Sequence, residues 1–111
     1  MTDISYDGDT LSLETRDIRF SRDIRSLVEL PEKVIVLLTP LEDDCQNIVA
    51  YSKHGDKVWE IEPVYTHSGD ECSPYTGVVR KENQVIAANW NSKDYIVNVE
   101  SGEVTRLRTT K

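Results

Sequence analysis

Residues 48–63 read IVAYSKHGDKVWEIEP, and this stretch decides the fold class. Apolar and polar residues alternate on both sides of a turn that contains Gly55. Alternation with a period of two is typical of half-buried β-strands, and glycine readily adopts the positive φ that tight hairpin turns require. The stretch therefore predicts a β-hairpin, with one strand before Gly55 and a second strand that includes Val58 and Trp59.

The same hairpin pattern occurs twice more, as ISYDGDTLSL at residues 4–13 and as VNVESGEVTRL at residues 97–107. The three turn glycines, Gly8, Gly55 and Gly102, are spaced 47 residues apart, and each is followed by an acidic residue. A fixed spacing of this kind is the signature of a repeat architecture. The hairpins are therefore interpreted as equivalent parts of one repeated unit.

Two apolar pairs extend the repeat toward its start. They recur 51 residues later in the chain, Leu27-Val28 as Val78-Val79 and Val34-Ile35 as Val85-Ile86. The loop at 39–47 is four residues longer than its counterpart at 89–93. One loop insertion therefore reconciles the spacings of 51 and 47 residues, as is usual among repeats.

We expect a single all-β domain over residues 1–111, with about ten short antiparallel strands. Repeat one covers about 24–61 and repeat two about 75–107, each forming a four-stranded sheet. The N-terminal hairpin at 4–13 matches only the last two strands of a unit. A short helix between residues 14 and 30 is the alternative for the remaining segment, although no clear apolar stripe supports it.

The stretch at 48–63 resembles a repeat of the quinoprotein-type β-propeller family. In that family a strand ending in Ala-Tyr/Leu-Asp leads through a glycine turn to Val-x-Trp, and Trp59 matches a packing residue. The resemblance implies sheets built like propeller blades, whether PQQ-like or WD40-like, and it implies no activity. A closed propeller usually has four or more blades, whereas this chain holds two units and one hairpin, without the Gly-His and Trp-Asp pair of WD40 repeats.

The charge balance narrows the classes of partner. With 20 acidic and 13 basic residues, the net charge is −7. Nucleic acids and anionic membranes both attract basic surfaces, so neither is an expected partner, and a basic protein is. The longest apolar run, Val34 to Leu38, is far shorter than the roughly 20 residues of a membrane-spanning helix. The start, MTDISYDGDT, lacks the features of a signal peptide, so we expect a cytoplasmic protein.

Two cysteines and two histidines form one candidate metal site: Cys45, His54, His67 and Cys72. Structural zinc sites usually contain closely spaced ligand pairs, which this set lacks. We therefore expect no bound metal and no cofactor. Because the chain is expected in the cytoplasm, both cysteines are predicted to be free thiols.

Two acidic runs precede the cysteines, Glu42-Asp43-Asp44 and Asp70-Glu71. Neither has the Asp-x-Asp-x-Asp-Gly spacing of a calcium-binding loop, so both are predicted to be solvated loops.

The only concentration of basic residues lies in ETRDIRFSRDIR at 14–25. Its four arginines, whose planar groups suit phosphate or carboxylate, are Arg16, Arg19, Arg22 and Arg25. The expected interpretation is a solvated face on which they pair locally, with Glu14, Asp17 and Asp23 as the partners.

The sequence contains no catalytic motif. It has no Gly-x-Ser-x-Gly, no phosphate-binding loop and no dinucleotide-binding glycine pattern, so no catalytic residue is assigned and the chain is not expected to be an enzyme. The two tryptophans, Trp59 and Trp90, and the tyrosines are expected in the core or on strand faces. We expect a non-enzymatic protein-binding or regulatory module whose binding residues the sequence does not identify. A monomer is favoured, and a homo-oligomer in which two or more chains complete a ring is the alternative. The alternative is a small metal-dependent or hydrolytic enzyme that uses the Cys, His and acidic loops.

Overall fold

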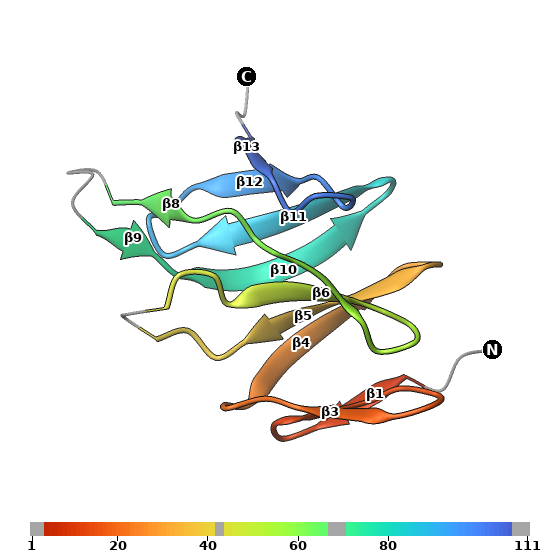
Figure 1. Cartoon of the computed structure of the whole chain (residues 1–111). Coiled ribbons are helices and arrows are strands. Elements are labelled where there is room, and N and C mark those ends of the chain that lie inside the picture. Colours follow the sequence, from red (N-terminus) through yellow and green to blue (C-terminus); the bar gives the residue numbers. More distant parts are fainter. Residues whose placement is uncertain (1–3, 42–43, 67–70, 108–111) are drawn as a thin grey trace.

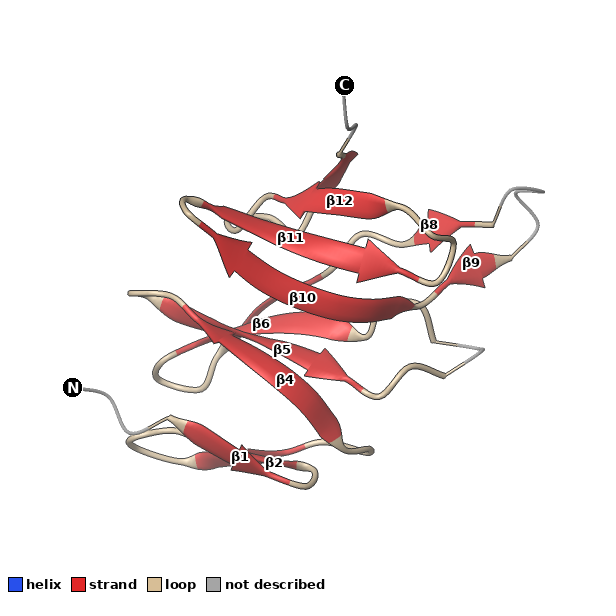
Figure 2. Ribbon diagram, turned by 180° about the vertical axis from the view of Figure 1, so that it is seen from behind, coloured by secondary structure: helices blue, strands red, loops and turns tan. Residues whose placement is uncertain are grey.

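A computed structural model describes residues 4–41, 44–66 and 71–107, and within them every regular element is a β-strand. The strands form antiparallel sheets, three of which stack in layers (Figures 1 and 2). The all-β prediction is therefore confirmed. In the described part of the chain, no helix is long and apolar enough to cross a membrane.

The N-terminal sheet contains β1 (Ser5–Asp7), β2 (Thr10–Ser12) and β3 (Asp17–Arg19), in that order. The first two strands are the predicted hairpin. The third was not predicted, because Ile18 is its only apolar residue and one residue makes no pattern. Ile18 pairs with Leu11 of β2. The helical alternative for residues 14–30 is wrong, since β3 and the next strand occupy that segment.

The two four-stranded sheets follow the chain order of their strands. The middle sheet contains β4 (Ile24–Glu29), β5 (Lys33–Leu38), β6 (Ile48–Ser52) and β7 (Lys57–Glu60). The C-terminal sheet contains β10 (Tyr75–Lys81), β11 (Gln84–Asn89), β12 (Asp94–Val97) and β13 (Val104–Arg106). A two-stranded sheet of β8 (Val64–Tyr65) and β9 (Cys72–Ser73) lies in the connection between them and was not predicted.

The main core lies between the middle and C-terminal sheets. On the middle sheet, paired residues of neighbouring strands, among them Val28, Ile35 and Ala50, face this core. Val85 and Ala87 of β11 face it from the other side. Strands that alternate inward and outward residues build such a core from one face of each sheet.

A second core lies on the opposite face of the middle sheet. Val34, Val36 and Val49 pack there against Leu11 and Leu13 of the N-terminal segment. Both faces of the middle sheet are therefore covered, and all six residues of β5 are buried. This explains why the longest apolar run of the chain lies in β5, because a strand buried on both faces needs no polar side.

The repeat relation also describes how the sheets stack. Val34 faces the N-terminal sheet, and its counterpart Val85 faces the middle sheet. Ile35 faces the C-terminal sheet, whereas its counterpart Ile86 belongs to the row that pairs with Val79 and Ile96 on the outer face. Equivalent faces of the two sheets therefore point the same way. A further sheet stacked in the same manner would cover the outer face of the C-terminal sheet.

Candidate functional site

A concave surface lies where three connecting segments meet, at the strand ends of the sheets. It is a hollow of about 800 Å³. Pro40 and Leu41 from the β5–β6 connection form one wall, and Cys72 and Pro74, from β9 and the residues after it, form a second. Trp90 from the turn between β11 and β12 forms the third. The hollow therefore depends on segments that are far apart in the sequence.

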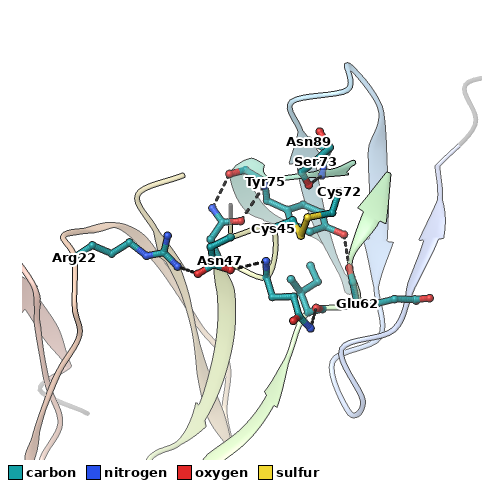
Figure 3. Close-up of a disulfide and its surroundings, with 11 residues drawn as sticks. Arg22, Cys45, Asn47, Glu62, Cys72, Ser73, Tyr75 and Asn89 are labelled. Atoms are coloured by element: carbon teal, nitrogen blue, oxygen red, sulfur yellow. Dashed lines mark hydrogen bonds and ion pairs between the residues drawn. A yellow bond between two sulfur atoms is a disulfide. The ribbon is translucent and has the colours of Figure 1, made fainter. Parts of the chain in front are cut away.

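A disulfide joins Cys45 to Cys72, with Cα atoms 5.8 Å apart (Figure 3). The prediction of two free thiols is therefore wrong for this structure. The cysteines are 27 residues apart in sequence, and they meet because the chain leaves β7, forms the β8–β9 hairpin and returns beside the start of β6. Spacing along the chain does not reveal such a long-range contact. Because both sulfurs are bonded to each other, neither is a thiolate ligand in this state.

Asn47 holds the backbone next to the disulfide. Its side chain is fully buried, and its Nδ2 donates hydrogen bonds to the carbonyls of Leu38 (3.0 Å) and Tyr75 (2.8 Å). Its Oδ1 accepts a hydrogen bond from the Tyr75 backbone N–H at 2.9 Å. This reciprocal pair, visible in Figure 3, fixes the start of β6 against the start of β10 independently of the two sulfurs.

Tyr75 itself belongs to the main core. Its hydroxyl donates a 2.7 Å hydrogen bond to the carbonyl of Glu62, and its ring packs edge-on against Tyr95. Burial raises the pKa of the Tyr75 phenol well above its usual range, and the nearby Tyr95 and Glu62 act in the same direction. A phenol in this state remains protonated and serves as a structural hydrogen-bond donor.

Trp90 is 73% exposed, so the expectation that it lies in the core or on a strand face is wrong. Its backbone is nevertheless held firmly, since its N–H donates to the carbonyl of Pro74 at 3.0 Å. On either side, Asn89 Oδ1 accepts from the Asn91 N–H and Asn91 Oδ1 accepts from the Lys93 N–H, both at 3.0 Å. Asparagines that bond the backbone two residues ahead stabilise turns, so the Asn-Trp-Asn-Ser sequence was the available signal for an exposed Trp90.

Further apolar side chains are exposed at this end. Leu41 is 47% exposed and lines the hollow beside Trp90. Tyr65 is 54% exposed, and its carbonyl accepts a hydrogen bond from Asn91 Nδ2 in the Trp90 turn. We call Leu41, Tyr65 and Trp90 the loop-end patch. Leu41 and Trp90 share the hollow, and large exposed apolar residues that gather at one site mark a candidate binding surface.

The predicted metal and acidic candidates do not form one cluster in the described chain. His54 is exposed in the β6–β7 turn, at the other end of β6 from Cys45. Asp44 forms an ion pair with Arg22, and Glu71 is exposed at the hollow. Among residues 4–41, 44–66 and 71–107, no group of three His, Cys, Asp or Glu residues is placed to bind a metal ion. The remaining candidates, Glu42, Asp43, His67 and Asp70, lie outside the described residues.

Two of the four arginines, Arg19 and Arg22, have other partners than expected. Arg19 pairs with Asp9 of the β1–β2 turn at 3.1 Å. Arg22 is almost buried; it pairs with Asp44 and donates to the Thr39 carbonyl at 3.1 Å. For Arg19 and Arg22, these contacts with Asp9 and Asp44 differ from the expected local pairs, because the fold brings residues of distant segments together. Arg22 thereby connects the N-terminal segment to the loop that carries Leu41 and Cys45.

Comparison with known proteins identifies a family by a match to its model. A search of the curated proteins and a search of the solved structures each returned no match. The family model described as Domain of unknown function (DUF7957) matches residues 1–109, and the chain therefore belongs to that family.

Proposed function

We propose that this chain is a non-enzymatic binding module whose loop-end patch and hollow bind a basic, partly apolar segment of a partner protein. The observation that carries the proposal is Trp90, an indole 73% exposed on a backbone held by hydrogen bonds. Tryptophan is enriched among the residues that dominate protein–protein binding energies. A side chain presented on an ordered turn also loses less backbone freedom on binding.

The charge of the chain indicates the chemistry of the partner. The net charge is −7, Glu71 is exposed at the hollow, and acidic residues directly precede both cysteines in the sequence. Complementary potential speeds association and selects against partners of like charge. A partner segment with lysines or arginines around one or two apolar residues fits this surface.

The chemical state of the cysteines supports binding over the enzymatic alternative. A nucleophilic cysteine acts as a thiolate, and so does a zinc ligand. Here Cys45 and Cys72 are joined, and His54 lies at the far end of β6.

Peptide selection tests the proposal directly. A random-peptide display library is selected on the immobilised wild-type protein, and enriched peptides are synthesised for binding measurements. We expect them to be net basic and to contain apolar residues. Their affinity should fall about tenfold or more in Trp90→Ser, which corresponds to at least 1.4 kcal/mol of binding free energy.

Val58→Ser is the matched control, because Val58 is also an exposed apolar residue (43%) but lies on β7, outside the patch. Binding should be unchanged in this variant. Peptides that are net acidic, or that bind Trp90→Ser as tightly as the wild type, would contradict the proposal, as would a library without enrichment.

A further inference from the structure

We infer that the Cys45–Cys72 disulfide is a thiol-exchange site that controls the loop-end patch: the oxidised chain binds its partner, and reduction weakens binding. This inference rests on the proposed function. The disulfide is placed for such control, since Cys72 lines the hollow and Cys45 follows the segment that supplies Pro40 and Leu41. It is thus a covalent connection between two walls of the binding surface.

The rest of the molecule does not depend on this connection for its contacts. The Asn47–Tyr75 hydrogen bonds still join β6 to β10, and both cores lie on the sheets. The turn that carries Trp90 is held by Asn89 and Asn91. Reduction is therefore expected to release the two walls relative to each other while leaving the stacked sheets folded.

The two cysteine residues differ in exposure, which favours attack at Cys72. Cys72 is partly exposed, whereas Cys45 is buried. A thiolate of an external dithiol attacks Cys72 Sγ, the sulfur–sulfur bond breaks, and Cys45 Sγ leaves with the electron pair and takes up a proton. The second thiol of the dithiol then displaces Cys72. The dithiol is oxidised to its disulfide, the protein gains two thiols, and an oxidant of the disulfide class reverses the reaction.

The acidic residues next to the two cysteines determine which reductant suits the experiment. Asp44 and Glu71 precede the two cysteines directly, and negative charge repels an anionic reductant while disfavouring nearby thiolates. A neutral dithiol such as dithiothreitol is therefore the appropriate reagent. In a reducing cytoplasm, which the sequence predicts for this chain, the site would be open to such exchange.

The two tryptophans allow local and global effects to be separated. In a proton–nitrogen correlation spectrum each of the two indole N–H groups gives one signal. The signal that is missing from the spectrum of Trp90→Phe belongs to Trp90. Trp59 Nε1 donates to the Val99 carbonyl at 2.9 Å inside the core, whereas Trp90 lies at the hollow. After dithiothreitol treatment we expect two titratable thiols, a shifted Trp90 signal and an unchanged Trp59 signal. The affinity for a selected peptide should fall about tenfold and return on reoxidation.

Each other result contradicts a defined part of the inference. Two free thiols with unchanged peptide affinity would overturn redox control, and so would loss of the Trp59 signal, because the bridge would then be a staple of the whole fold. The Cys45→Ser/Cys72→Ser variant must bind as weakly as the reduced wild type. If no peptide binds the oxidised protein while the Trp90 signal still responds to reduction, the proposed function fails and the redox-driven change of the hollow stands.

Discussion

Gly102 illustrates how single residues limit this fold. Its φ is +81°, and a Cβ placed on it would lie 2.7 Å from a ring carbon of Trp59 and 2.9 Å from the carbonyl oxygen of Glu60. Gly8, the equivalent turn residue of the N-terminal hairpin, has a φ of +60° but no neighbour closer than 3.9 Å. The two glycines share a backbone requirement, and only Gly102 also has a packing requirement.

We predict that Gly102→Ala lowers the free energy of unfolding by roughly 2–5 kcal/mol, because overpacking adds to the left-handed backbone cost. Gly8→Ala, the matched control, should cost only about 1–2 kcal/mol. Urea denaturation of both variants measures the difference. Equal losses would show that the contact between Gly102 and Trp59 has no energetic consequence.

Tyr75 gives a prediction about alkaline pH. Its pKa is raised in the folded protein, so the folded state retains a proton that the unfolded chain releases at its ordinary pKa of 10.0. The stabilisation is complete below that pH and is lost as the pH rises above it toward the folded pKa. Denaturation midpoints between pH 9 and 11 should fall more steeply for the wild type than for Tyr75→Phe. Parallel curves for the two proteins would contradict this assignment.

At the scale of elements, Asn47 shows how a loop and a strand start are joined. In Asn47→Asp, the carboxylate could not donate to the Leu38 and Tyr75 carbonyls, and a buried charge would be introduced. We expect a loss of roughly 3 kcal/mol or more at neutral pH, because unsatisfied buried polar groups and unpaired buried charges are both destabilising.

Asn98→Asp is the control for this substitution. Asn98 is exposed, and its side-chain oxygen accepts a hydrogen bond from the Glu100 N–H, which an aspartate can also accept. The free energy of unfolding of the Asn98→Asp variant should differ from that of the wild type by less than about 0.5 kcal/mol, as is usual for surface substitutions. A similar loss in both variants, measured by urea denaturation, would mean that the Asn47 bridge is not a special connection.

The elements also show which local patterns can be recognised. Strands with alternating or β-branched residues, such as β5, β6 and β11, were predicted from the sequence. Strands β8 and β9 have two residues each, too few to show a period. Such strands exist because neighbouring segments supply the pairing partners.

For the whole molecule, the N-terminal sheet is a structural layer. Leu11 is fully buried against the middle sheet, whereas Leu41 is 47% exposed at the loop-end patch. Leu11→Ala should therefore lower the unfolding free energy by about 2–5 kcal/mol, as expected for leucine truncation in a core.

Leu41→Ala provides the matched comparison in thermal or urea denaturation. Its free energy of unfolding should change by less than about 0.5 kcal/mol. If the proposed function holds, the variant should also bind the selected peptides more weakly than the wild type does. A loss in Leu11→Ala as small as the loss expected for Leu41→Ala would contradict a role of Leu11 in the second core.

The outer face of the N-terminal sheet is polar, whereas the outer face of the C-terminal sheet is partly apolar. The outer row of the N-terminal sheet holds Ser5, Ser12 and Asp17, which are polar. The outer face of the C-terminal sheet exposes Val79 (51%). We predict a monomer, because one short apolar row is small beside the roughly 800 Å² per partner of a stable interface, and the net charge of −7 opposes association. Light scattering at moderate salt should give 12.7 kDa, and a stable dimer would contradict this.

The sequence by itself determined the fold class, the two four-stranded sheets and the N-terminal hairpin, because strand alternation and turn glycines such as Gly55 and Gly102 act over a few neighbouring residues. Only the tertiary structure decided that Cys45 meets Cys72 and that Arg22 pairs with Asp44. These features depend on how the sheets stack and on where the connection from β7 to β10 returns. They arise between residues that are distant in sequence, and no local periodicity records such contacts.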